Sequence, residues 1–274
     1  MTSHAPEINH HRGGSGEPLV LIHGVGHHWQ GWLPALPLIE THFDTYACDS
    51  PGFGASPPLA PGIPATIPNY ATAFEAWFAA QGLDRPHVAG NSMGGAVAIE
   101  LARRGAARSA TAFSPAGFWT PRERAYCQRS LGAVAAIPRP ARPAVRAALR
   151  TAPGRRAFLA QLIKRPADLP GELAVGDVDA LWAAPSMAAA LAGFTEYTCA
   201  PLPPEVTTPV RVVWGDADRL LLARTQPARA RKVLPRAEHE LIDAGHLPAS
   251  DAPRAVADAI VSTARAAAPD PHAG

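Results

Sequence analysis

The candidate chemistry centres on Ser92, which stands between two glycines where an apolar segment ends. Residues 90–94 read G-N-S-M-G, a G-x-S-x-G pattern. Between a strand and a helix, this pattern forms a tight turn with an unfavourable backbone angle, and the positions two residues away must lack side chains. The hydroxyl then projects above the sheet, beside the positive end of the next helix. A glycine-rich turn without chemistry has the same pattern, so other residues must decide.

A serine hydroxyl is a weak nucleophile near neutral pH, so it needs a general base and a carboxylate that orients the base. In a fold with this turn, the acid and then the histidine follow the serine, each just past a strand end. Asp216 and Asp218 follow the apolar segment PVRVVW, and His246 follows HELID. Both aspartates satisfy this order. The pattern therefore predicts a nucleophile, Ser92, and a base, His246, with the acid still open.

Acyl transfer also needs donors for the negative oxygen that forms on the attacked carbonyl. One expected donor is the backbone N–H of Met93, at the start of the helix after the nucleophile. The second is expected from the loop after the segment PLVLIHG, where Val25 stands between two glycines that let backbone approach a substrate. We therefore predict an oxyanion hole made by Val25 and Met93.

His27 and His28 follow the predicted oxyanion loop. We expect them to pack in the loop or to line the pocket wall and contact substrate. A metal site is not expected, because adjacent positions do not easily share an ion and no cysteine or carboxylate neighbours them in the sequence. The predicted mechanism needs neither a metal nor a cofactor.

The elements that must position these residues alternate between strand and helix. Short apolar segments predict buried parallel strands, at residues 17–24, 43–48, 86–91, 109–115, 209–215 and 237–243. Segments with helical spacing lie between them and after them, at residues 29–40, 71–83, 93–105, 223–234 and 253–267. This alternation is typical of an α/β protein with a doubly wound, mostly parallel sheet.

The alternation is interrupted once. Residues 117–205 are helical in pattern and punctuated by prolines, and strand–helix alternation then resumes. We therefore predict one α/β core, formed by residues 1–116 and 206–274, with a helical insertion at residues 117–205.

Composition and charge narrow the function classes. The net charge of +2 is too balanced to indicate nucleic-acid binding. The chain has no uninterrupted apolar run long enough to cross a membrane, and its first residues lack the apolar run of a signal peptide. Its three cysteines are widely spaced, which suits a reducing compartment. We expect a cytoplasmic protein that acts on a small molecule, away from membranes.

Together these motifs resemble the α/β-hydrolase-fold superfamily. The resemblance rests on HGVG, DSPGFGAS, GNSMGG, WGDADRL and AGHLP, which occur in the family order. It implies an α/β-hydrolase fold with a helical cap, here residues 117–205, inserted after the sixth core strand. The family pattern G-x-x-D places the acid at Asp218, and it gives Asp49 a structural role in its loop. Family members have two antiparallel strands before the HG strand, so the short start here implies a short or missing edge strand.

The resemblance implies a cofactor-independent serine hydrolase that acts on an ester or related acyl compound. A carbon–carbon bond hydrolase of ring-cleavage diketones is an alternative, although such enzymes carry an aromatic residue after the histidine motif and this chain has Leu247. An acyltransferase and a cofactor-free haloperoxidase-like perhydrolase are further alternatives. A ligand-binding protein of the same fold with very slow turnover is the alternative outside enzymes.

Overall fold

The computed structural model describes residues 6–267, so both ends of the predicted core, residues 1–5 and 268–274, lie outside the described residues. One sheet organises the molecule. Its strands are β1 (His10–Gly14), β2 (Glu17–Ile22), β3 (Phe43–Cys48), β4 (His87–Asn91), β5 (Ser109–Phe113), β6 (Val210–Gly215) and β7 (Glu238–Ile242). Their order in the sheet is β1-β3-β2-β4-β5-β6-β7. All neighbours pair in parallel except β1, which runs antiparallel to β3.

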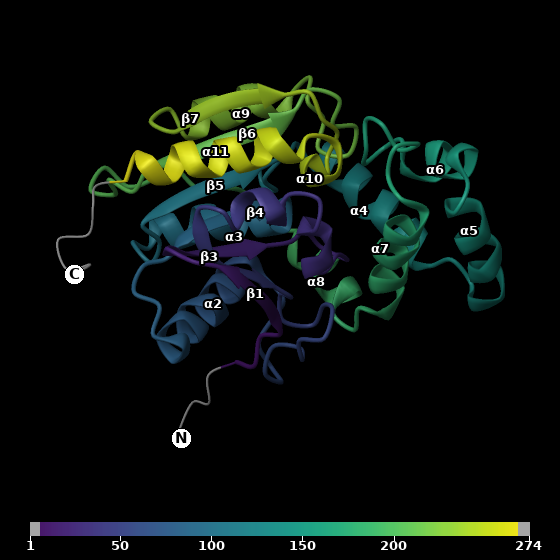
Figure 1. Cartoon of the computed structure of the whole chain (residues 1–274), viewed down its shortest axis with the longest axis horizontal. Coiled ribbons are helices and arrows are strands. Elements are labelled where there is room, and N and C mark those ends of the chain that lie inside the picture. Colours follow the sequence, from purple (N-terminus) through teal and green to yellow (C-terminus); the bar gives the residue numbers. More distant parts are fainter. Residues whose placement is uncertain (1–5, 268–274) are drawn as a thin grey trace.

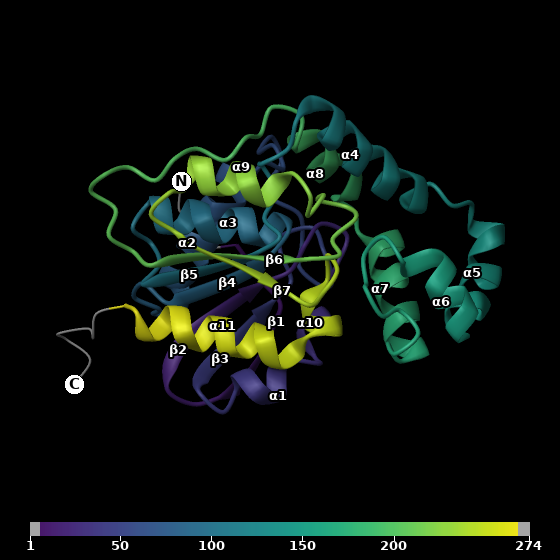
Figure 2. The ribbon, with the colours of Figure 1, turned by 90° about the horizontal axis from the view of Figure 1, so that it is seen from above.

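Helices cover both faces of this sheet because its central strands are apolar on both sides. Successive side chains of a strand point to opposite faces. On β2, Val20 and Ile22 belong to the hydrophobic cluster that contains Trp77, whereas Leu19 and Leu21 belong to the cluster that contains Ile260. Figure 2 shows α2, α3 and α9 on one side of the sheet and α1 and α11 on the other. The sheet is therefore doubly wound, as the sequence predicts.

Apart from α10, which the sequence did not predict, the core helices match the predicted helical segments in position but not always in length. They are η1 (Trp29–Trp32, a 3₁₀ turn), α1 (Leu36–Ile39), α2 (Ile67–Gln81), α3 (Met93–Arg103), α9 (Gln226–Val233), α10 (Pro248–Asp251) and α11 (Pro253–Arg265). The segment 29–40 is two short pieces rather than one helix. Pro34 lies between them, and a proline inside a helix removes a backbone donor and clashes with the preceding turn.

Between β5 and β6 the chain forms the helical insertion. Its helices are α4 (Pro121–Ala135), η2 (Arg139–Ala141, a 3₁₀ turn), α5 (Arg142–Leu149), α6 (Ala152–Leu159), α7 (Gly171–Ala183) and α8 (Met187–Gly193). Figures 1 and 2 show α5, α6 and α7 standing off one end of the sheet. These helices share a small apolar cluster of their own, which includes Leu149, Ile163 and Val178. We call α4–α8 the cap helices.

The cap follows the fifth strand of the described chain, so the expectation that it follows the sixth is wrong in count. The reason lies at the start of the chain. Among the described residues before β2, the chain forms one antiparallel strand, β1, and the family pattern has two. The short edge expected from the sequence is therefore present, and every later strand number is reduced by one. No helix within residues 6–267 combines the length and the apolar character needed to span a bilayer.

A partly buried ion pair connects the cap to the core. Glu123, in the first turn of α4, accepts hydrogen bonds from Arg229 of α9, from the Thr225 hydroxyl at 2.5 Å and from the Thr120 backbone N–H at 2.7 Å. Thr120 caps the same helix through the Glu123 N–H, which completes a capping box. Burial raises the pKa of Glu123, but the bonds to Arg229 and Thr225 outweigh it and hold the pKa at about 2.

This pair predicts an acid-sensitive contribution to stability. A carboxylate with a depressed pKa in the folded state stabilises the fold above its unfolded pKa, and that contribution is lost as the pH falls from about 4.5 to about 2. Glu123→Gln should therefore lower the free energy of unfolding by about 1–3 kcal/mol at pH 7, and by progressively less toward pH 2.5. Urea denaturation of both proteins across this pH range measures the difference. Glu196→Gln, at an exposed carboxylate of the insertion, is the matched control. A deficit that stays constant with pH would contradict the assignment.

Candidate active site

Ser92 occupies a sharp turn between β4 and α3. Its backbone angles are φ 57° and ψ −112°, a region that residues with side chains rarely adopt, and the residue is buried. The flanking glycines are sterically required. A Cβ atom at Gly90 would lie 2.2 Å from the carbonyl oxygen of Gly94, and one at Gly94 would lie 2.1 Å from that of Ile22. The turn therefore presents the Ser92 side chain at the carboxyl end of the parallel strands.

Two loops from neighbouring strands bring His246 and Asp218 together. His246 follows β7 and Asp218 follows β6, and the His246 Nδ1 lies 2.8 Å from the Asp218 Oδ2. Both residues are buried. The loops can approach because Gly215 ends β6 without a side chain: a Cβ there would lie 2.0 Å from the Gly245 carbonyl oxygen. The side-chain amide of Asn91 donates to the His246 carbonyl oxygen at 2.9 Å, which anchors the histidine loop beside Ser92.

The two aspartates of the segment GDAD have different environments. The second oxygen of Asp218, Oδ1, accepts the backbone N–H groups of Leu220 and Leu221 at 2.9 and 2.8 Å. The carboxylate is thus oriented from both sides. Asp216 is half-exposed and pairs at 2.8 Å with Lys164, which also contacts Asp243. Of the two candidate acids, it is Asp218 that contacts His246.

Ser92 and His246 line one cavity under the cap, with about 960 Å³ of empty space including the part open to solvent. Its walls are mostly aliphatic side chains from the cap helices and the loops beside them. They include Leu131, Val134, Val145, Leu149, Leu159 and Val178. In the part of the chain that the structure describes, no lysine or arginine lines this cavity. The cap therefore makes a mostly apolar chamber over the serine, with the Asp177 carboxylate and the His27 imidazole at its edge.

The predicted oxyanion donors flank the serine. Met93 is the first residue of α3, and the first N–H groups of a helix have no acceptor within the helix. Val25 lines the cavity in the loop after β2. That loop lies against the nucleophile, because a Cβ at Gly24 would come within 3.2 Å of the Ser92 Cβ. The two backbone segments thus approach the Ser92 side chain from adjacent elements.

Asp49 holds the loop that carries the histidines. Its Oδ1 accepts the Trp29 backbone N–H at 2.7 Å, directly after His28. Its Oδ2 accepts the Asn9 side chain at 2.7 Å and the Ala55 backbone N–H at 2.9 Å. Asp49 therefore ties together three segments beside the cavity, which agrees with the structural role implied for it.

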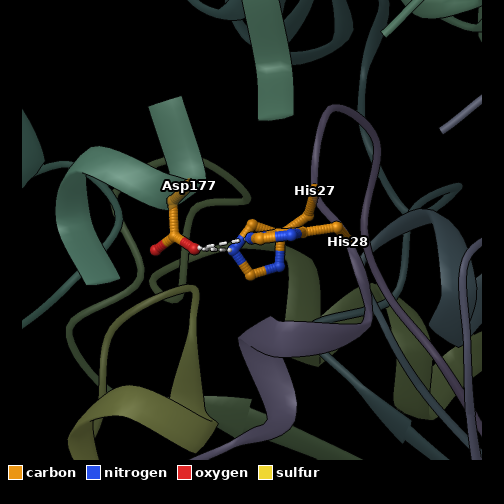
Figure 3. A group of neighbouring side chains, drawn as sticks. All are labelled: His27, His28 and Asp177. Carbon is orange, nitrogen blue, oxygen red and sulfur yellow. Dashed lines mark hydrogen bonds and ion pairs between the residues drawn. The ribbon is translucent and has the colours of Figure 1, made fainter. Parts of the chain in front are cut away.

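His27 and His28 have a carboxylate partner that the sequence pattern misses. Asp177 of α7 places its Oδ1 3.0 Å from the His27 Nε2 and 3.3 Å from the His28 Nε2. Figure 3 shows the carboxylate directed at both rings, which come from the loop after β2. The signal for Asp177 in the sequence is slight: it is an acidic residue next to Val178, on a cap helix that is largely apolar.

The contact shifts the pKa values of His27 and Asp177. Burial lowers the pKa of His27, but the Asp177 carboxylate outweighs it, so this pKa lies above its ordinary value. Burial raises the pKa of Asp177, but the two imidazoles hold it well below its usual range. A charged carboxylate of the cap therefore faces the imidazoles of the core at the edge of the cavity.

Several curated proteins align with part of the chain, among them the following two. The dihydrolipoyllysine-residue acetyltransferase component of the acetoin cleaving system of Cupriavidus necator is 35% identical over 109 residues, which are 39% of this chain and 29% of that protein. The 2-hydroxy-6-oxo-6-phenylhexa-2,4-dienoate hydrolase of Comamonas testosteroni is 32% identical over 99 residues, 35% of this chain and 34% of that protein. The alignments thus span about a third of these relatives' own lengths.

Whole-chain similarity is found among solved structures. A thermophilic esterase from Thermogutta terrifontis superposes with a TM-score of 0.73, over 97% of this chain and 95% of that one, at 24% sequence identity. At this identity the likeness shows a common fold. The sequence model of the alpha/beta hydrolase family matches residues 19–259, from β2 through the cap and into α11. The chain therefore belongs to the alpha/beta hydrolase family.

Proposed function

We propose that this protein is a serine hydrolase that cleaves an ester or related acyl bond of a small, apolar molecule. The observation that carries the proposal is the arrangement of Ser92 and His246. Both line one cavity, the serine on a strained turn and the histidine held by the buried carboxylate of Asp218. This is the combination that nucleophilic acyl transfer requires.

The mechanism follows from these contacts. The Asp218 carboxylate accepts the Nδ1–H of the neutral His246, which leaves the Nε2 lone pair free to act as the base. As the Ser92 Oγ bonds to the carbonyl carbon, its proton moves to Nε2, and Asp218 stabilises the imidazolium. The backbone N–H groups of Val25 and Met93 stabilise the negative oxygen.

The leaving group then departs with that proton, and an acyl-enzyme on Ser92 remains. Water attacks the acyl carbon while His246 takes one of its protons, and the proton returns to the serine oxygen as the acid is released. The cap limits access of bulk water to this cavity, which strengthens the electrostatic interactions within it.

The cavity walls favour an uncharged acyl group. Aliphatic side chains are complementary to an alkyl or aryl chain, and burying such a chain is favourable in proportion to its apolar area. Hydrolysis of a carbon–carbon bond is the second candidate, supported by the partial similarity to the Comamonas testosteroni dienoate hydrolase. The walls argue against it as the main activity, since none of the described residues that line the cavity is a lysine or arginine that could pair with a carboxylate-bearing substrate.

A fluorophosphonate probe tests the proposal directly. We expect the folded protein to gain one covalent adduct at Ser92, located by peptide mass spectrometry, and to hydrolyse p-nitrophenyl butyrate faster than the acetate. His246→Ala should slow labelling by at least about a hundredfold, because the base is then absent. Denatured protein is the control for non-specific reaction. A folded protein that is not labelled would instead support a binding protein with very slow turnover. Faster turnover of a ring-cleavage dienoate than of any ester would support carbon–carbon hydrolysis.

A further inference from the structure

We infer that His27, His28 and Asp177 form a binding site for a divalent transition metal, with Zn²⁺ as the best match, between the cap and the core. The three side chains each offer one ligand atom, and these atoms all lie within 4.8 Å of one another. Two imidazoles and one carboxylate are a known ligand set for zinc with an open fourth position. The mechanism proposed above for Ser92 does not use this group.

The spacing of the ligand atoms fits a single ion. In a tetrahedral zinc site with bonds of about 2.0–2.1 Å, neighbouring ligand atoms lie about 3.3 Å apart. The Asp177 Oδ1 lies 3.0 Å from the His27 Nε2 and 3.3 Å from the His28 Nε2. The two separations therefore match those of a first coordination shell, and Figure 3 shows the three groups converging.

The orientation of His27 also fits a metal better than a simple ion pair. Its buried Nε2 makes no hydrogen bond, although the Asp177 oxygen is only 3.0 Å away. The ring nitrogen thus approaches the carboxylate without pointing at it. A metal ligand has this relation to a neighbouring ligand when both are aimed at one ion. The His28 Nε2 is within hydrogen-bond geometry of the same oxygen at 3.3 Å, so in this structure the relation holds for His27.

The fold holds the two histidines in place for this role. The His27 ring packs against Gly31, where a Cβ would lie 1.9 Å from the ring. The next residue after His28 is fixed by the hydrogen bond from the Trp29 N–H to Asp49. A ligand pair on a loop fixed at this end loses less conformational freedom when an ion binds. No metal was expected from the sequence, because adjacent residues do not easily share one ion. In the structure both rings nevertheless reach the same Asp177 oxygen, so the two histidines can face one ion.

An ion at this position joins the cap to the core. His27 and His28 belong to the loop after β2, and Asp177 belongs to α7. His27 and Asp177 also line the cavity that contains Ser92. The fourth coordination position is therefore on the side of the substrate chamber, where a water molecule or an oxygen of a bound ligand could complete the shell.

Calorimetric titration of the tag-free full chain with ZnCl₂, without substrate, tests the site independently of any hydrolytic activity. We expect one Zn²⁺ per chain and a rise in Tm of about 5 °C or more at saturating Zn²⁺. The cysteines are poor competitors, since all three are buried and burial raises the pKa of the Cys127 thiol to about 12.

Three variants assign the ligands. Asp177→Asn and His28→Asn should each weaken Zn²⁺ binding by at least about tenfold. Removing a residue that only hydrogen-bonds to a metal ligand already costs about this much affinity, so removing a ligand itself should cost no less. Asp179→Asn should leave it unchanged, because Asp179 lies on the same helix but pairs with Arg146. Circular dichroism confirms that each variant is folded. The inference is overturned if the parent protein binds no Zn²⁺, or if it binds Zn²⁺ equally well after both ligand substitutions. In that case the three residues form only an ion pair between cap and core.

Discussion

Ser92→Ala should abolish ester hydrolysis, with kcat for p-nitrophenyl butyrate falling by about four to six orders of magnitude. Alanine removes the only atom of this side chain that can form the acyl-enzyme, while the apolar cavity and the turn remain. Substrate binding should therefore change little, and the loss should appear in kcat rather than in KM. Steady-state kinetics of the purified variant measure both parameters.

Ser114→Ala is the matched control for this experiment. Ser114 is also a buried serine at a strand end with a positive φ, 41°, and its hydroxyl makes no hydrogen bond. It follows β5 and does not line the cavity. We expect this variant to keep the activity of the parent. If Ser92→Ala retained turnover while Ser114→Ala lost it, the nucleophile would be assigned to the wrong strand end.

Asp218→Asn should lower kcat by about 10⁴-fold, because it would hold His246 in the wrong tautomer. The contacts of Asp218 explain why the isosteric change is so severe. Its Oδ1 accepts two backbone N–H groups, from Leu220 and Leu221, so an asparagine there must keep its oxygen on that side. The amide NH₂ then faces the His246 Nδ1 and donates to it. The proton is displaced to Nε2, where the base is needed.

Asp216→Asn gives the comparison within the same loop. Its carboxylate is half-exposed and pairs with Lys164, away from His246. Exposed pairs of this kind contribute about 0–1 kcal/mol to stability, so we expect kcat within a few-fold of the parent and a small change in Tm. The opposite pattern, with Asp216→Asn inactive and Asp218→Asn active, would mean that the acid is misassigned. The two variants should be compared at one pH and one substrate concentration series.

Two of the polar contacts between the cap and the core test different properties. Glu123 and Arg229 join α4 to α9, and Asp177 joins α7 to the loop after β2. The Glu123–Arg229 pair should contribute to the free energy of unfolding in a way that is lost at low pH. Asp177 belongs to the site that we infer to bind a metal ion. Because the two contacts lie on different cap helices, substitutions at one should not alter the measurement made at the other.

The sequence by itself determined the features that depend on local sterics and on strand order. The tight turn at Ser92 leaves no room for side chains at Gly90 and Gly94, so the five-residue motif at positions 90–94 was enough to predict the turn. The alternation of strands and helices predicts a doubly wound sheet, which the structure and the family match confirm. The carboxyl ends of parallel strands meet at one edge, so the order of Ser92, Asp218 and His246 along the chain was enough to predict their common location.

Only the tertiary structure decided the features that depend on contacts between distant segments. The order of the residues alone left Asp216 and Asp218 open, and the family pattern pointed to Asp218. The structure adds the physical reason, because the tight loop turns the Asp218 carboxylate toward His246 and the Asp216 carboxylate toward Lys164. The apolar chamber is formed by cap helices whose helical pattern does not show which face points at Ser92. Asp177 is 149 residues from His28, and no local signal predicts their contact. Such pairs form only when the cap packs on the core. That packing depends on many small contacts between side chains far apart in the sequence, so no short motif predicts it.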